Sequence, residues 1–378
     1  MNVKLTDICN IQYGYAFNSA MFSSEIGVPL IRIRDVVRGY SETYTSEECA
    51  DEYVVHDGDI LIGMDGEFNI AFWRGGKAYL NQRVCRLIPS DKVDKDYLFY
   101  YMPKALKAIE DRTPFVTVKH LSAKQLNAIV VPLPDFDEQK RISEKLRNVD
   151  KLIELRKEQL NMLDLLVKSR FIELFGDMLL NDMAWQESAL GTLADVVSGI
   201  TKGRKIRETE LIEVPYMAVS NVKDGYIDWT TVKTIMATKQ EIEQYRLLPY
   251  DVLMTEGGDP DKLGRGSVIT TPLENSIHQN HVFRVRLRAE IILPVYFSEY
   301  LQHQKAKRYF LRCAKQTTGI ASINMKQLRA LPVLVPPLEL QEQFAAFVNQ
   351  IDKSKFDLKQ SLEKLEMLKK SLMQQYFG

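Results

Sequence analysis

The chain carries a long direct repeat, in which residues 323–378 match residues 121–176 without a gap and at a constant offset. Gln139 in the first copy corresponds to Gln341 in the second. A duplication of this kind predicts that one structural unit occurs twice, so the two halves of the chain are expected to share a fold.

Within each copy, apolar residues recur at alternating steps of four and three, which predicts a long helix with an apolar seam. A helix over residues 138–175 would be about 57 Å long at ~1.5 Å per residue. Each seam needs an apolar partner, and the other helix is the simplest one. The seam residues are Ile142, Leu146, Val149, Ile153, Leu160, Leu163 and Val167, and Phe344, Val348, Ile351, Leu358, Leu362, Leu365 and Leu372.

Weaker similarity extends the repeat backwards into the region before each helix. A buried strand running into a turn and a second strand are predicted in both halves. They are residues 29–36 with 215–222, and residues 81–87 with 279–285. A helical pattern follows in each half, over residues 97–109 and 294–313. Each half is therefore predicted to be a mixed α/β domain followed by a long helix.

The predicted order is a domain over residues 1–135, a helix over 136–176, a second domain over 177–338 and a final helix over 339–378. The second domain is tied to the end of the first helix and to the start of the second. A parallel helix pair would make that domain bridge the whole helix length, so we expect antiparallel coiled-coil helices that join and space the domains, with pseudo-twofold symmetry.

Composition limits the classes of function without selecting one. Fifty basic and fifty acidic residues leave a formal net charge of zero, so composition gives no support for nucleic-acid binding. The four cysteines lie far apart and no His or Cys spacing is typical of a metal site, which favours reduced thiols in a cytoplasmic protein and no bound metal. The sequence shows no apolar run of membrane-spanning length and no signal-peptide start, so no membrane partner is expected.

Four features of the chain resemble the specificity subunit of type I restriction-modification systems. They are the tandem arrangement itself, the proline-bearing segments before each helix at 131–139 and 335–341, the helix end at 174–177, and residues 185–196 at the opening of the second domain. The resemblance implies two target recognition domains, each reading one half of an asymmetric bipartite target in double-stranded DNA. It also implies that the helices dock two methyltransferase subunits.

In that family S-adenosylmethionine belongs to the methyltransferase subunits, and ATP-driven translocation and cleavage, for which ATP and Mg are expected, belong to restriction subunits. The resemblance therefore implies a chain without catalytic residues or a cofactor of its own. The sequence agrees by omission, because it contains no phosphate-binding Gly-Lys-Ser/Thr loop and no Asn-Pro-Pro-aromatic or Asp-Pro-Pro-aromatic string. Its five histidines stand apart from any nucleophile signature and are interpreted as surface or hydrogen-bonded residues.

Basic clusters supply the candidate DNA contacts. Lys305, Arg308, Arg312 and Lys315 follow helical spacing and would line one face, although a solvated basic face explains this spacing equally well. In the first domain Arg32, Arg34 and Arg38 are predicted to alternate along a strand and turn. The other candidates are Arg74, Lys77, Arg83, Lys119, Lys202, Arg204, Lys205, Arg207, Arg265, Thr317 and Thr318.

Amide residues occupy matching places in both halves, at 81–82 and 279–280. Domains that read different bases should differ where they read, so we interpret these amides as structural and the divergent loops at 114–120 and 316–321 as base-reading segments.

Two hypotheses follow. The first is a DNA-recognition subunit that places its two domains at most roughly 17 base pairs apart, taking the helix length and ~3.4 Å per base pair. The second is a coiled-coil scaffold whose duplicated domains bind protein partners. The neutral net charge slightly favours the scaffold, whereas the layout favours the DNA-recognition subunit.

Overall fold

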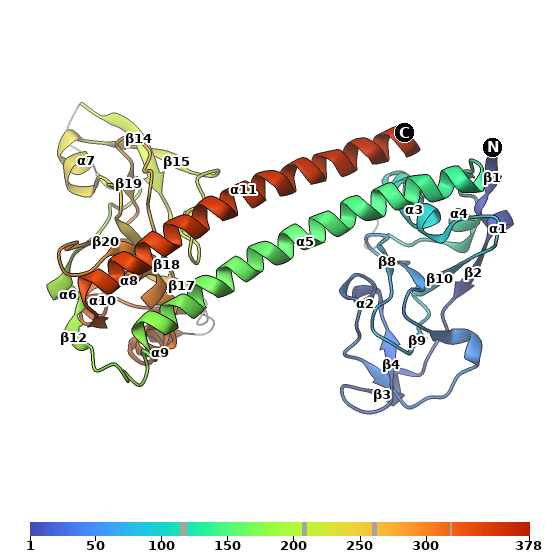
Figure 1. Ribbon diagram of the computed structural model, residues 1–378, viewed down its shortest axis with the longest axis horizontal. Helices are drawn as coiled ribbons and strands as arrows, with labels where there is room; N and C mark the ends of the chain where they lie inside the picture. The colour runs from blue at the N-terminus through green and yellow to red at the C-terminus, as the bar shows by residue number, and fades with distance from the viewer. Residues whose placement is uncertain (114–118, 206–209, 259–262, 318–319) are drawn as a thin grey trace. The chain divides into compact units, whose positions relative to one another are not determined.

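The computed structural model describes residues 1–113, 119–205, 210–258, 263–317 and 320–378. Its contacts divide the chain into two compact units, Met1–Lys157 with Lys359–Gly378, and Glu158–Leu358. Both units contain mixed helices and strands, labelled in Figure 1. The first is called unit 1 and the second unit 2.

Unit 1 is built on a four-stranded antiparallel sheet. Its order is β2 (Cys9–Tyr13), β10 (Val84–Pro89), β7 (Ile60–Gly63) and β8 (Ile70–Phe72). A second sheet has the order β3 (Phe22–Ser23), β5 (Tyr44–Thr45), β4 (Val28–Ile31), β9 (Ala78–Leu80) and β6 (Val54–Val55), in which β4 and β9 run parallel. The strand β1 (Asn2–Lys4) pairs with β11 (Val130–Pro132).

The helices of unit 1 are α1 (Leu5–Ile8), α2 (Ile33–Arg38), α3 (Lys95–Arg112) and α4 (Ala123–Asn127), with 3-10 turns η1 (Ser19–Met21) and η2 (Asp51–Tyr53). The main core joins the four-stranded sheet to α3 and to the long helices. Leu87 of the sheet, Tyr97 of α3 and Leu146 all belong to this cluster, and each is almost fully buried.

Unit 2 repeats this design with different residues. Its four-stranded antiparallel sheet has the order β13 (Ala194–Ser198), β20 (Val282–Leu287), β16 (Val252–Thr255) and β18 (Gly266–Val268). A three-stranded sheet contains β15 (Lys233–Ala237), β14 (Ile212–Met217) and β19 (Ile277–His278), and another contains β17 (Gly257–Gly258), β22 (Ile320–Ser322) and β21 (Lys315–Thr317). The strand β12 (Gln186–Ala189) pairs with β23 (Pro332–Val335).

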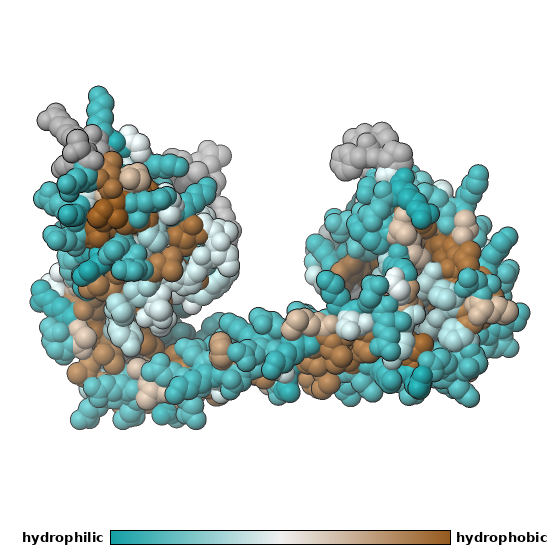
Figure 2. Space-filling model, turned by 90° about the horizontal axis from the view of Figure 1, so that it is seen from above, coloured by the Kyte–Doolittle hydropathy of each residue, from teal (hydrophilic) through white to brown (hydrophobic). Residues whose placement is uncertain are grey.

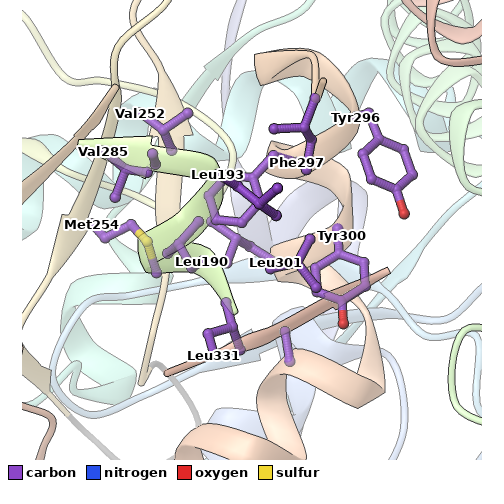
Figure 3. Packing of buried hydrophobic residues seen from close by; sticks show 14 of the residues in the cluster. Leu190, Leu193, Val252, Met254, Val285, Tyr296, Phe297, Tyr300, Leu301 and Leu331 are labelled. Atoms are coloured by element: carbon purple, nitrogen blue, oxygen red, sulfur yellow. The ribbon is translucent and has the colours of Figure 1, made fainter. Parts of the chain in front are cut away.

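The shorter helices of unit 2 are α6 (Leu190–Leu193), α7 (Lys239–Tyr245), α8 (Pro294–Gln302), α9 (Gln304–Cys313) and α10 (Met325–Arg329), with the 3-10 turn η3 (Val219–Asn221). Figure 3 shows part of the core, where leucines of α6, Val252 and Met254 of β16, and the aromatic residues of α8 gather. Tyr296 and Tyr300 are fully buried, and their hydroxyls donate to backbone oxygens of Leu334 and Pro332, which ties α8 to β23.

Two long helices, α5 (Phe136–Phe175) and α11 (Leu338–Phe377), contribute a segment to each unit. In unit 1, Asp150 pairs with Lys369 at 2.6 Å and Lys157 with Glu366 at 3.8 Å. As residue numbers rise along α5 their partners fall along α11, so these two segments are antiparallel.

Unit 2 has the same arrangement of helix segments. Asp164 pairs with Lys355 at 2.6 Å, and the rings of Phe171 and Phe344 lie 5.4 Å apart. The order of the contacts again runs in opposite directions along α5 and α11, so these segments are antiparallel as well.

Burial of the seam residues varies along the two helices. The buried set is Ile142, Leu146, Val149, Ile153, Val167, Phe344 and Ile351. The half-buried set is Leu160, Leu163, Val348, Leu358, Leu362, Leu365 and Leu372.

Over residues 29–36 the predicted strand is present, but the predicted turn after it is a helix. The strand β4 ends at Ile31, and α2 begins at Ile33. The backbone N–H of Arg32 donates to the buried Asp35 carboxylate at 2.9 Å, which satisfies a free amide at the helix start. Arg32, Arg34 and Arg38 therefore do not alternate along a strand.

The single helix expected over residues 294–313 was also wrong. His303 is extended, with φ −78° and ψ 153°, and divides this stretch into α8 and α9. Because its ring nitrogen accepts from the N–H of Lys305, His303 caps a new helix instead of continuing the old one. The helix α9 ends at Cys313, so Lys315 lies in β21 and does not share the helical face of Arg308 and Arg312.

Candidate nucleic-acid interface

A concave surface of about 450 Å³ in unit 1 brings together three of the predicted DNA contacts. Arg32 and Arg34 come from the start of α2, and Arg83 comes from the turn between β9 and β10. The rest of this surface, called the arginine cleft below, is lined by Phe17, Ser19, Phe22, Ile33, Asn81 and Gln82.

The arginines of the cleft are held while remaining accessible. Arg34 Nε lies 3.6 Å from the carboxylate of Asp35, and its Nη2 donates to Thr43. Its side chain is still 53% exposed, and that of Arg83 is 52% exposed. Guanidinium groups in such positions can contact phosphates or the acceptor edge of guanine.

A close backbone approach fixes the turn that carries Arg83. Gly14 lies against this turn, and a Cβ at Gly14 would sit 2.0 Å from the carbonyl oxygen of Asn81, so only glycine fits. The Asn81 side chain accepts from the N–H of Gln82 at 2.8 Å. In unit 2 the Gln279 side chain accepts from the N–H of Val219. These bonds give Asn81 and Gln279 a structural role, whereas the Gln82 side chain lines the arginine cleft and Asn280 contacts His281.

Sequence reasoning missed the aromatic part of the cleft. Phe17 and Phe22 lie in a segment without a basic cluster or a repeat match, and only the fold places them beside Arg32. Phe17 is buried and its ring is stacked on that of Tyr79, so it supports the wall of the cleft, whereas the half-buried Phe22 offers an aromatic side chain beside the guanidinium groups.

The remaining candidates of unit 1 lie elsewhere. Arg38 and Arg74 line a larger concavity of about 860 Å³ against α3 and α5, where Arg74 lies 3.7 Å from Glu154. Arg38 lies 3.5 Å from Glu42. Lys77 is exposed in the turn between β8 and β9. Lys119 is only 20% exposed and pairs with Glu110 at 3.0 Å.

Arg204 of unit 2 makes a two-pronged contact inside the protein. Its Nε and Nη2 each donate to a carboxylate oxygen of Glu241 at 2.5 Å, and Nη2 also reaches the backbone oxygen of Met236. The bonds from Arg204 lower the pKa of Glu241, and the bond to Glu241 raises the pKa of Arg204. This guanidinium therefore anchors its loop to α7. Lys202 and Lys205 in the same loop are exposed.

The basic face predicted on α9 is divided by the fold. Lys305 is 17% exposed and pairs with Glu187 at 2.8 Å, whereas Arg308 and Arg312 are exposed. Lys315 is exposed at the start of β21, and Thr317 ends that strand. Arg265 is half-buried before β18. Arg207 and Thr318 lie outside the residues that the structure describes.

Groups that serve metal or thiol chemistry are dispersed. Among the described residues no three His, Cys, Asp or Glu side chains come together as metal ligands. All four cysteines are free thiols, and burial raises the pKa of both Cys9 and Cys85 to about 12. Within the described part of the chain, the helices lack the combination of length and apolarity needed to cross a bilayer.

His278 is a buried histidine, and its Nδ1 has the hydrogen bond expected for a core histidine. Its Nδ1 lies 2.7 Å from the backbone oxygen of Val282. Burial lowers the pKa of this fully buried ring to about 4, so the ring is neutral.

Comparison with known proteins places these features in context. The family model described as the type I restriction modification DNA specificity domain matches residues 1–165 and 183–369. The specificity subunit of the type I restriction enzyme EcoBI from Escherichia coli is 28% identical over 381 residues, which span 93% of this chain and 79% of that protein. The MjaVIII specificity subunit from Methanocaldococcus jannaschii is 24% identical, over 91% and 87% of the two chains.

Two solved structures share the fold. The type I restriction-modification S subunit from M. genitalium superimposes with a TM-score of 0.60 at 15% identity, covering 99% of this chain and 94% of that one. A chain from a structure concerned with complex assembly and conformational transition of the type I R-M system gives a TM-score of 0.57 at 17% identity, covering 100% and 97%.

Proposed function

The chain belongs to the family of type I restriction-modification DNA specificity proteins, and on this premise we propose that it is the subunit that recognises an asymmetric bipartite target in double-stranded DNA. The observation that carries the proposal is the double match of the family model, once in each half of the chain. In this proposal each matched half supplies one reading head, and α5 and α11 act as coiled-coil helices that set the spacing of the half-sites about a pseudo-twofold axis.

Differences between the two heads support an asymmetric target. The arginine cleft of unit 1 carries Arg32 and Arg34, and the corresponding positions of unit 2 hold Ala218 and Ser220. Arginine can form two hydrogen bonds with the O6 and N7 acceptors of guanine. Alanine offers only an apolar contact, and serine offers one hydroxyl. Heads that differ in this way are expected to prefer different half-sites.

Exposed apolar side chains on the long helices support docking of two methyltransferase subunits. Leucine, isoleucine, methionine and phenylalanine residues on α5 and α11 remain outside both cores, and Figure 2 shows brown residues between teal ones along the helices on the face in view. These residues are Leu152, Leu155, Met162, Leu165, Leu166, Ile172, Phe356, Met367 and Leu368. Apolar surface left uncovered in this way is typical of a protein-binding face.

The remaining parts of the proposal concern chemistry and assembly. We place S-adenosylmethionine on the methyltransferase subunits and ATP with Mg on restriction subunits, and we give this chain no catalytic step and a cytoplasmic location.

The test is duplex binding by the chain assembled with methyltransferase subunits from the same source. We expect retention of a split DNA motif in a gel-shift assay, and loss of affinity with Arg34→Ala. The matched control is Arg141→Ala, because Arg141 is a similarly exposed arginine on α5. An assembled complex that retains no duplex, or retains all duplexes equally, would support the protein-binding scaffold instead.

A further inference from the structure

Both units contain the same small frame of backbone hydrogen bonds at the end of an inner strand of the four-stranded sheet. This strand is β7 in unit 1 and β16 in unit 2. In unit 1 the N–H of Met64 donates to the oxygen of Arg83 at 3.0 Å, and the N–H of Leu121 donates to the oxygen of Met64 at 2.7 Å. The frame joins three segments that are far apart in the sequence. It therefore defines one place in the fold, which can be compared between the units.

The equivalent bonds recur in unit 2 with nearly the same lengths. The N–H of Glu256 donates to the oxygen of His281 at 3.0 Å, and the N–H of Ile323 donates to the oxygen of Glu256 at 2.8 Å. Met64 thus corresponds to Glu256, Arg83 to His281 and Leu121 to Ile323.

Side chains at this frame form a carboxylate-held cluster in unit 1. His120 Nδ1 lies 2.6 Å from Asp65 Oδ1, and Arg83 Nε lies 3.6 Å from Asp65 Oδ2. The carboxylate is 23% exposed, whereas Arg83 and His120 are 52% and 48% exposed. About half of each of the Arg83 and His120 side chains is therefore accessible, with Arg83 Nη1 3.4 Å from His120 Nδ1, and Arg83 also lines the arginine cleft.

Unit 2 rebuilds the pair from residues at other positions. His281 Nδ1 lies 2.5 Å from Glu256 Oε2, with side-chain exposures of 57% and 31%. The carboxylate has moved by one position, from the residue after Met64 to the counterpart of Met64 itself, and the histidine stands where unit 1 has Arg83. The pairing of a carboxylate with a nitrogen-bearing side chain is therefore kept at the same position of the fold although the residues that make it differ. This indicates that the position itself has a function.

Stability does not explain such pairs. Exposed ion pairs and hydrogen bonds contribute little to folding, because water competes for both partners. What a carboxylate does provide is orientation, since it takes the Nδ1–H of the ring and leaves Nε2 pointing away as a hydrogen-bond acceptor. In unit 2, Asn280 Nδ2 lies 3.1 Å from His281 Nε2, which agrees with an accepting Nε2.

We propose that this place is the base-reading element of each head, with Arg83 and His120 reading one half-site and His281 reading the other. Asp65 and Glu256 are positioning residues that aim these side chains. The inference rests on the proposed function and deepens it. Arg83 matches the acceptor edge of guanine in the major groove. His281 Nε2 can accept from the amino group of adenine or cytosine when the base takes the place of the Asn280 amide.

The experiment is a selection from duplexes of random sequence by the chain assembled with its methyltransferase subunits, followed by sequencing of the retained pool. We expect Arg83→Ala combined with His120→Ala to relax the preference for guanine in one half of the motif, by about tenfold. His281→Ala should relax an adenine or cytosine position in the other half only. The matched control is His56→Ala, which removes an exposed ring elsewhere in unit 1.

The positioning role has its own measurement. Asp65→Asn should weaken discrimination at the same base pairs as Arg83→Ala, with an unchanged melting temperature, because a merely structural residue would shift melting and leave the motif intact. A wild-type complex that selects a split motif, with variants that keep every position of it, overturns this inference alone. A wild-type complex that selects no motif overturns the proposed function together with the inference.

Discussion

Replacing Gln341 by leucine should destabilise unit 2 strongly, because this buried side chain serves one buried and two half-buried backbone groups. Gln341 lies in the first turn of α11 and is fully buried. Its Oε1 accepts from the N–H of Leu293 at 2.8 Å, and its Nε2 donates to the oxygens of Ile291 at 3.1 Å and Pro336 at 2.8 Å. Leucine has a similar volume but can satisfy none of them.

The magnitude follows from the number of groups left without a partner. A buried polar group that loses its hydrogen bond costs about 1–3 kcal/mol, and a half-buried one stands at the low end of that range because water reaches it. One buried and two half-buried groups therefore give an expected loss of about 3–5 kcal/mol for Gln341→Leu. In unit 1 the equivalent Gln139 makes two such bonds, with the N–H of Asp94 at 2.8 Å and the oxygen of Pro134 at 3.0 Å. Gln139→Leu should therefore cost less, about 2–3 kcal/mol.

Scanning calorimetry and urea denaturation measure both variants. A change of 1 kcal/mol moves the melting temperature of a unit of this size by about 2–4 °C, so the transition that reports unit 2 should fall by roughly 10 °C. The matched control is Gln343→Leu, the same substitution at an exposed position of α11. The reasoning is refuted if Gln341→Leu and Gln343→Leu melt alike, or if Gln139→Leu costs more than Gln341→Leu.

Three further predictions concern charge and packing. Arg204 holds the pKa of Glu241 below its ordinary 4.5, so the pair stabilises unit 2 above that value and loses its contribution as the pH falls through the lowered pKa; in urea denaturation, Glu241→Gln should be destabilising at neutral pH and nearly silent in acid. Burial lowers the pKa of His278 from 6.5 to about 4, so the unfolded chain binds a proton that the folded chain does not, and His278→Leu should remove part of the stability loss between those values in a pH series of melts. Leu146→Ala in the core should cost about 2–5 kcal/mol, whereas Leu165→Ala, at a side chain 61% exposed, should leave melting unchanged and weaken methyltransferase binding in titration calorimetry.

Much of the architecture follows from patterns that are local in the sequence. The helix ends are an example, because the expected span of 136–176 agrees within a residue with Phe136–Phe175. A helical period is a pattern among neighbouring residues, and a duplication is a match between two segments. Both can be recognised in the sequence without knowledge of the fold. The same reasoning failed at Arg32 and His303. At each of these residues a capping hydrogen bond starts a helix that the spacing of apolar residues does not predict.

Only the tertiary structure decided which candidate residues form a site. Arg32, Arg34 and Arg83 share one cleft although the chain separates them, while Arg38 lies in another concavity despite following Arg34 closely. Arg204 looks like the other candidate arginines in the sequence, yet its Nε and Nη2 both donate to the Glu241 carboxylate. The sequence by itself determined that two related α/β units and two long helices exist, because a repeat and a helical period can be recognised from the order of the residues alone. Which charges remain available depends on partners brought in by folding from distant segments, and that information lies in the three-dimensional contacts.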